Sequence, residues 1–266
     1  MERLKQNNME ELELRKQIIE ICHYLQERNL VARTWGNVSA RLDDEYFLIT
    51  PSGLSYDLTT PEDLVKVKIK DCSYDKTQRK PSSEKLIHSK AYELRKDVNF
   101  VVHTHQFYAS AICAEEFSVT LGDTFVPCAD YGLPGTKALA NNVKNVYIKF
   151  PECNIFLMAK HGTICLGSSK DEALLNAEYL ETECKKLFVK RVPEFYVPEK
   201  MDAYLDDYAQ MFPALDNEDQ DAIKMVKEKN AAAALYAKDG KPMNKFDVKL
   251  QRFVYTKKYS KLKDKQ

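Results

Sequence analysis

The sequence predicts a layered α/β domain in which short strands alternate with helices. Three patterns lead to this fold class. Apolar residues recur at helical spacing near the N-terminus, two short strands follow across an Asp-Asp turn, and helical and strand-like segments alternate between residues 84 and 190. Elements of this kind bury their apolar faces by stacking helices against a sheet.

The first third of the chain is expected to hold one long helix and three strands. Residues 9–27 form an amphipathic helix, because apolar and charged positions recur at helical spacing. Residues 37–53, NVSARLDDEYFLITPSG, form two strands and end in a Pro-Ser-Gly loop. Residues 59–71 open with a capped helical turn that starts at proline, and continue as a half-buried strand with alternating Val65, Val67 and Ile69.

The following segments continue the alternation as far as residue 190. A serine-capped helix in SSEKLIHSKAYELRKD leads into an apolar strand at residues 100–104. The segment NIFLMAKHGTICLG is expected to form two strands hinged at Lys160-His161-Gly162. The remaining expected elements are a helix at 107–114, a strand near 124–128, a helix after Pro134-Gly135 and a long helix at 171–190.

The composition changes after this alternation, and we expect a compact domain at residues 1–195 with a helical, lysine-rich extension at 196–266. The simpler interpretation is a helical appendage that packs on the domain or on a neighbouring subunit and ends in a solvated lysine-rich segment. The alternative is a basic arm that closes over an anionic ligand. The sequence does not decide between them.

Charge and cysteine content restrict the class of protein. The formal net charge is zero, so no global charge favours nucleic acid or a membrane surface, and no apolar run approaches the length of a bilayer-spanning helix. The seven cysteines are scattered and include no C-x-x-C pair. Together with an N-terminus that has no apolar leader, this pattern favours reduced thiols and a cytoplasmic protein.

The segment FVVHTHQ places two histidines, His103 and His105, in an apolar strand. Residues i and i+2 of a strand leave the same face, so both imidazoles can reach one point. A third histidine, His161, lies at the hinge between two expected strands. Three histidines with one open position are typical of a catalytic zinc site. The alternative is three unrelated histidines, of which His103 and His105 line a polar pocket; His23 and His88 lie in helices and are interpreted as structural or surface residues.

Three other stretches have the composition of anion-binding loops. TWGNVSAR and ITPSGLSYD each put a glycine beside small polar residues at the end of a strand, where backbone N–H groups can face a phosphate. PSSE adds two hydroxyls at a helix N-terminus, which favours negative charge. The alternative for each stretch is a hairpin turn or a helix cap without a ligand.

Five motifs, in this order, resemble the class II aldolase/adducin family, and within it the fuculose-phosphate aldolases and ribulose-phosphate 4-epimerases. The resemblance covers about residues 10–192, and the tail after residue 195 lies outside it. The motifs are GNVS at 36–39, TPSG at 50–53, PSSE at 81–84, VVHTH at 101–105 and KHG at 160–162.

The resemblance implies a central, mainly antiparallel β-sheet flanked by helices, which makes residues 1–195 a class II aldolase-like catalytic domain. It implies Zn²⁺, or another divalent metal such as Mn²⁺ or Co²⁺, held by His103, His105, His161 and Glu84. Glu84 would leave the metal and act, with a raised pKa, as the catalytic acid/base. A substrate phosphate pocket would consist of Asn37, Ser52, Gly53, Ser82 and Ser83.

The implied activity is cleavage of a phosphorylated ketose, such as L-fuculose 1-phosphate or a related deoxy-ketose phosphate, into dihydroxyacetone phosphate and an aldehyde. Glu84 in the SSE motif favours an aldolase, whereas Trp35 in TWGN is the residue that the epimerases have in this motif. A 4-epimerase, a sugar-phosphate dehydratase and a non-catalytic adducin-like module are the alternatives. Tyr108 and Tyr131 are candidates for the proton donor, although neither matches by motif. The resemblance also implies a homotetramer with its sites at subunit boundaries.

Overall fold

The computed structural model describes residues 2–31 and 35–191. In this part of the chain, one sheet has the strand order β3-β2-β1-β4-β9-β8-β7, and all neighbouring pairs are antiparallel except β7 and β8. The expected fold class, a mainly antiparallel sheet flanked by helices, is therefore confirmed. The strands of this sheet are β1 (Asn37–Arg41), β2 (Tyr46–Ile49), β3 (Val65–Lys68), β4 (Phe100–Thr104), β7 (Cys128–Ala129), β8 (Ile155–Met158) and β9 (Gly162–Gly167).

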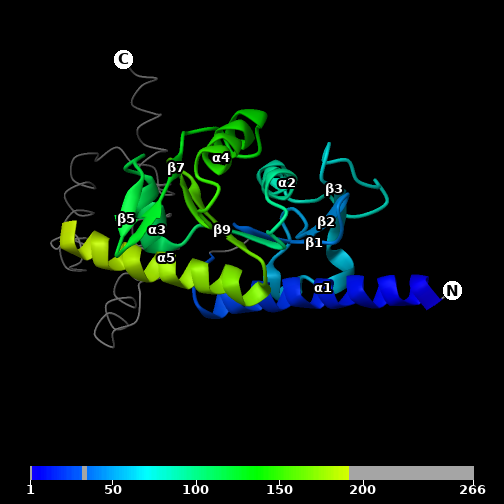
Figure 1. Cartoon of the computed structure of the whole chain (residues 1–266). Coiled ribbons are helices and arrows are strands. Elements are labelled where there is room, and N and C mark those ends of the chain that lie inside the picture. The colour runs from blue at the N-terminus through cyan, green and yellow to red at the C-terminus, as the bar shows by residue number, and fades with distance from the viewer. Residues whose placement is uncertain (1, 32–34, 192–266) are drawn as a thin grey trace, which may run out of the picture. The chain divides into compact units, whose positions relative to one another are not determined.

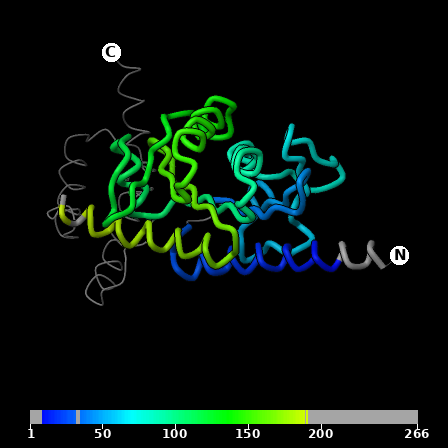
Figure 2. The backbone as a smooth tube through the Cα atoms, viewed as in Figure 1, coloured from blue at the N-terminus to red at the C-terminus, as the bar shows by residue number. Residues whose placement is uncertain are grey.

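Helices cover both faces of the sheet. The helices are α1 (Glu2–Glu27), α2 (Lys85–Leu94), α3 (Phe107–Cys113), α4 (Lys137–Lys149) and α5 (Lys170–Arg191), with short 3-10 turns η1 (Tyr56–Leu58) and η2 (Pro61–Asp63). In Figure 1, α2 and α4 lie on one face, and α1 and α5 run along the other. The tube in Figure 2 shows the same two layers, and the Tyr24 hydroxyl of α1 donates to Glu178 of α5 at 2.6 Å.

Most of the elements expected from sequence are present within a few residues of their expected bounds. The hairpin of β5 (Val119–Leu121) and β6 (Thr124–Val126) was not expected as a separate two-stranded sheet. The serine cap expected for α2 is wrong: the N-cap is Glu84, and the Ser82 hydroxyl accepts from the Glu84 N–H before the helix begins. The expected extension at residues 196–266 lies outside the described residues.

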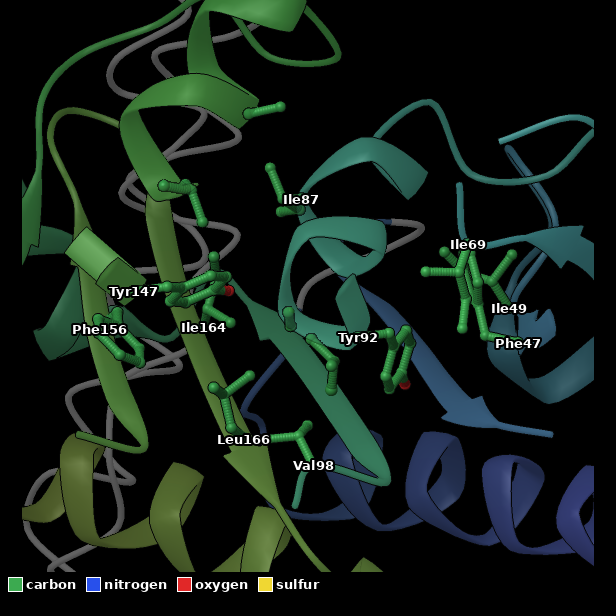
Figure 3. Packing of buried hydrophobic residues seen from close by; sticks show 14 of the residues in the cluster. Phe47, Ile49, Ile69, Ile87, Tyr92, Val98, Tyr147, Phe156, Ile164 and Leu166 are labelled. Atoms are coloured by element: carbon green, nitrogen blue, oxygen red, sulfur yellow. The ribbon is translucent and has the colours of Figure 1, made fainter. Parts of the chain in front are cut away.

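The large core lies between the sheet and the helices α2 and α4. Figure 3 shows Tyr147 of α4 over Phe156 of β8 and Ile164 of β9, with Ile87 of α2 facing the same layer. The Tyr147 and Phe156 rings are 4.9 Å apart and meet edge to face. Burial of each large apolar side chain contributes roughly 1.5–3 kcal/mol. The core therefore holds α2 firmly over the middle of the sheet.

No described helix is both long enough and apolar enough to cross a lipid bilayer.

Two buried tyrosines of this core differ in how their hydroxyls are satisfied. The Tyr147 hydroxyl makes no hydrogen bond with any described residue, whereas the Tyr92 hydroxyl is 2.7 Å from the Ser39 hydroxyl. We expect Tyr147→Phe to raise the free energy of unfolding by about 1 kcal/mol, because a buried unsatisfied hydroxyl is costly. Tyr92→Phe is expected to lower it by about 1 kcal/mol. Urea denaturation measures both, and a Tyr147→Phe protein less stable than Tyr92→Phe would contradict the expectation.

Candidate functional site

The central strand β4 brings the sequence-predicted residues of the site together. Its neighbours are β1 on one side and β9 on the other, and Asn37 of β1 lies directly opposite His103 of β4. Opposed residues of an antiparallel pair project from the same face of a sheet. His103 and Asn37 therefore face α2, whose first residue follows Glu84.

Glu84, His103, His105 and His161 form one cluster. Each offers a ligand atom, and these four atoms all lie within 4.8 Å of one another. Glu84 Oε2 is 2.9 Å from His103 Nε2, and Glu84 Oε1 is 2.9 Å from His161 Nε2. The Nε2 atoms of His103 and His105 are 3.0 Å apart, although β4 ends at Thr104 and His105 is the first residue beyond it. The expected convergence of these four side chains is thus present in the geometry.

The chemistry of the cluster fits a divalent cation. His103 Nδ1 is 2.8 Å from the carbonyl oxygen of Thr163, which can only accept, so Nδ1 donates this hydrogen bond and Nε2 is the ring atom that faces the cluster. Glu84 Oε1 is buried and accepts no hydrogen bond from a described residue, despite its closeness to His161 Nε2. A carboxylate and ring nitrogens that face one point form the donor set of a divalent cation, and one cation can contact all of them.

The charge state of Glu84 agrees with this role. Burial acts to raise the pKa of Glu84, but the charge and hydrogen bond of His103, together with the charge of His161, outweigh burial and hold the pKa well below its ordinary value. The carboxylate is therefore ionised where it lies. The raised pKa expected from sequence concerns a carboxylate that has moved away from the histidines, and for that position it stays a prediction.

The turn between β8 and β9 places His161. Lys160 has a φ of 54°, in the left-handed region, and its N–H donates to the carbonyl oxygen of Cys113 at 2.8 Å. A Cβ at Gly162 would lie 2.6 Å from the Thr104 carbonyl oxygen and 3.1 Å from His103 Cε1. Only glycine lets the start of β9 approach the end of β4 this closely. Gly162 is therefore a structural requirement for the convergence of the imidazoles.

Four of the five expected phosphate-binding residues lie on two loops that pair with each other, and the fifth, Asn37, lies in β1. The Ser52 N–H donates to the Lys80 carbonyl oxygen at 2.9 Å, and the Ser82 N–H donates to the Thr50 carbonyl oxygen at 3.1 Å. Ser52, Gly53 and Ser83 are exposed, and Gly53 has a φ of 77°, which favours glycine. Ser82 is buried and contacts the Glu84 N–H through its hydroxyl. These loops are joined to the cluster directly, since PSSE ends at Glu84.

Asn37 contacts Glu84 itself. Its Nδ2 donates to Glu84 Oε2 at 3.1 Å, and both side chains are buried. The Asn37 Oδ1 is hydrogen-bonded to His88 Nε2, and His88 Nδ1 is 2.6 Å from the Ser39 hydroxyl. Sequence reasoning placed Asn37 with the phosphate loops and did not connect it to Glu84.

His88 was interpreted from sequence as structural or surface, and the structure shows it fully buried between α2 and β1. The signal that could have found it is its spacing. Glu84 and His88 are four residues apart, which puts them on one face of a helix. His23 is exposed on α1.

The two tyrosines considered as proton donors occupy different environments. Tyr108 is buried in α3, and its ring lies 4.8 Å from Phe107 and 5.7 Å from Phe188. Tyr131 is 52% exposed. Trp35, in contrast, lies beside the cluster, with its ring centroid 6.3 Å from that of His105.

The burial of His88 predicts a specific pH dependence of stability. Burial, followed by the charge of His103, lowers the pKa of His88 to about 3 from 6.5. Below about pH 6.5, His88 binds a proton in the unfolded chain but stays neutral in the folded chain. The contribution of His88 to the free energy of unfolding is therefore fully present above that pH and is lost as the pH falls. Between pH 7 and pH 5, the titration of His88 lowers the free energy of unfolding by about 2 kcal/mol.

Denaturant unfolding at both pH values checks this expectation. His88→Gln has no titrating group and should lose about 2 kcal/mol less than the unmodified protein on acidification. His23→Gln, a matched change at an exposed histidine, should follow the unmodified protein. Equal losses in all three proteins would contradict the assignment of His88 as a buried neutral imidazole.

Comparisons with known proteins place the chain in a family. The family model for the class II aldolase and adducin N-terminal domain matches residues 16–188. A 5-methylthioribulose-1-phosphate/5-deoxyribulose-1-phosphate aldolase of Escherichia coli O45:K1 is 32% identical over 182 residues, covering 65% of this chain and 83% of that protein. An L-fuculose phosphate aldolase of Methanococcus maripaludis is 33% identical over 174 residues, covering 62% of this chain and 91% of that protein.

A solved structure agrees with the sequence comparisons. An L-fuculose 1-phosphate aldolase superposes with a TM-score of 0.61 at 25% identity, covering 70% of this chain and 89% of that chain. The matched segment contains the sheet, the paired loops and the cluster of three histidines and one glutamate. The chain therefore belongs to the class II aldolase and adducin family and is an enzyme of its aldolase class.

Proposed function

We propose that this protein is a zinc-dependent aldolase that cleaves a ketose 1-phosphate reversibly into dihydroxyacetone phosphate and an aldehyde. The observation that carries the proposal is the four-ligand cluster of Glu84, His103, His105 and His161 beside two hydroxyl-bearing loops. The relatives named above act on fuculose phosphate and on 5-deoxy or 5-methylthio pentulose phosphates. A ketose phosphate with a deoxygenated or apolar end is the substrate class that we favour.

The three histidines would hold the metal, with Glu84 as a displaceable fourth ligand. Zinc, when bound, supplies Lewis acidity toward the carbonyl and hydroxyl oxygens of the sugar. Manganese or cobalt would fit the same nitrogen and oxygen donors, and zinc is favoured because tetrahedral sites with histidine ligands are typical of it.

The residues of the chain divide the remaining work. Ser52, Gly53, Ser82 and Ser83 would bind the phosphate through hydroxyl and backbone N–H groups, with Asn37 at the boundary toward Glu84. Binding the phosphate away from the reacting bond fixes its orientation. Glu84, once displaced from the histidines by the sugar oxygens, would hold and return the proton of the substrate hydroxyl.

We further propose that the domain at residues 1–195 carries this activity in the cytoplasm as a homotetramer. All seven cysteines are free thiols, which agrees with a reducing compartment. A monomer in light scattering would contradict the expected assembly.

A panel of phosphorylated ketoses tests the activity. We expect at least one of L-fuculose 1-phosphate, 5-deoxyribulose 1-phosphate and 5-methylthioribulose 1-phosphate to release dihydroxyacetone phosphate. Removing the metal with a chelator should abolish the release, and Glu84→Gln should lower kcat by about 10²-fold or more. His23→Gln is the matched control. L-Ribulose 5-phosphate is tested as well, and its inversion at carbon 4 without any cleavage would instead establish an epimerase. The absence of both reactions would favour a non-catalytic interaction module.

The only tryptophan of the chain offers a direct measure of metal binding. Trp35 is 39% exposed and adjacent to His105, so Co²⁺ in the cluster should quench its fluorescence. We expect saturation near one Co²⁺ per chain, and an affinity at least about 100-fold weaker in His103→Ala, because a ligand is lost. His23→Ala should bind like the unmodified protein. An unmodified chain whose fluorescence ignores Co²⁺ would contradict the metal site.

A further inference from the structure

Two ladders of polar side chains meet between α2 and β1. Glu84, His88 and Tyr92 are spaced by four residues along α2, and Asn37 and Ser39 are spaced by two along β1. Four helical residues advance about 6 Å and two strand residues about 6.7 Å, so the two rows stay in step. His88 lies between the two strand residues and contacts both.

The contacts with Glu84 favour one direction for the hydrogen bonds between these ladders. Asn37 Nδ2 donates to Glu84 Oε2, because a carboxylate can only accept, and this leaves Asn37 Oδ1 facing His88. Oδ1 is an acceptor, so the neutral imidazole of His88 donates from Nε2. Its Nδ1 then accepts from the Ser39 hydroxyl, and the Ser39 oxygen accepts in turn from Tyr92, 2.7 Å away.

The reversed arrangement is unfavourable. A His88 ring protonated at Nδ1 would present a lone pair at Nε2, and the Asn37 amide would have to rotate to donate to it. Asn37 Oδ1 would then face the Glu84 carboxylate, oxygen against oxygen, in a buried site. An unpaired buried acceptor next to a negative charge costs free energy that the observed arrangement avoids.

We propose that His88 is a positioning residue of the active site: it fixes the orientation of the Asn37 amide, which in turn holds the Glu84 carboxylate against the histidine cluster. This inference rests on the proposed function for its catalytic meaning, whereas the contacts from His88 to Asn37 and from Asn37 to Glu84 are present in the structure. His88 touches neither metal nor substrate in this scheme. It acts through Asn37 alone, and that is what separates it from a merely packed core histidine.

A double-mutant cycle between His88 and Asn37 tests the proposal. The variants are His88→Phe, Asn37→Ala, the combination of both, and His88→Gln, whose side-chain amide can still donate to Asn37 Oδ1. Co²⁺ affinity is read from Trp35 fluorescence, and kcat and KM are measured on the ketose phosphate that the unmodified protein cleaves. His88→Phe is expected to weaken Co²⁺ binding and to lower kcat by about 10-fold each, as is typical when a residue that orients a metal ligand is lost.

The interpretation depends on non-additivity. If His88 acts through Asn37, His88→Phe causes no further loss, within about twofold, once Asn37 is alanine. His88→Gln should recover a substantial part of both losses. Additive losses, or a His88→Gln protein no better than His88→Phe, overturn the proposal. His23→Phe is the matched control on the surface.

Measurements on the same set of variants distinguish effects on folding from effects on metal binding and catalysis. Circular dichroism identifies any variant that does not fold, and if His88→Phe fails to fold, the cycle is run with His88→Ala, whose smaller side chain also lacks a donor. An unmodified protein that binds Co²⁺ but cleaves no sugar phosphate contradicts the proposed function, while the Co²⁺ arm of the cycle still decides the role of His88. Non-additive Co²⁺ affinities then support it, and additive ones overturn it.

Discussion

The confinement of three imidazoles and one carboxylate within 4.8 Å of one another is the constraint on which the rest of the structure depends. Ionisable groups taken out of water are costly unless opposite charge compensates them. The site is therefore stable only if a cation, or protons in its place, lies among the ligand atoms. The strand pairings, the β8–β9 turn and the hydrogen bonds around the cluster position the four ligand side chains or fix their orientation.

The sheet determines the position of one ligand directly and of the others through the segments that join its strands. His103 is fixed by its place in the central strand, with β1 and β9 paired on either side, and by the Thr163 carbonyl oxygen that holds its Nδ1. His161 depends instead on a turn, which Lys160 closes in a left-handed conformation. Glu84 belongs to neither the sheet nor this turn, because it is the N-cap of α2 and contacts Asn37, the first residue of β1. A ligand held by a helix end and by side-chain contacts can leave more readily than one held within a strand.

Sequence patterns predicted the architecture well where the periodicity was long. The alternation at Val65, Val67 and Ile69 and the apolar run of β4 identified strands correctly, and the long helices were also found. One strand was expected near residues 124–128, where the structure has β6 and β7 in different sheets, and β5 was not expected, because strands of two or three residues carry too little periodicity. The cap of α2 was misplaced because two serines precede Glu84, and either of them satisfies the usual capping pattern.

The site shows the same division between local and tertiary information. His103, His105, His161 and Glu84 were found because each lies in a short, recognisable motif, although their meeting depends on strand pairings between distant segments. The role of His88 was missed because the residue was interpreted only as part of an amphipathic helix, and its four-residue spacing from Glu84 was not used. Its partners, Asn37 and Ser39, are about fifty residues away, and no pattern within one element relates the pitch of a helix to the pitch of the strand beneath it.

The hydrogen-bonded connection from Tyr92 to Glu84 also explains how a displaceable ligand can remain well placed. Each link in it is buried, and each has one donor and one acceptor, so a rotation at any point leaves a polar atom unsatisfied. Such a chain gives the carboxylate a defined partner in Asn37 that does not depend on the metal. Protons and a divalent cation compete for the imidazoles, whereas the Asn37 amide offers the same donor whichever of them is bound. The orientation of Glu84 is therefore set by the neutral side of the site, and its charge by the histidine side.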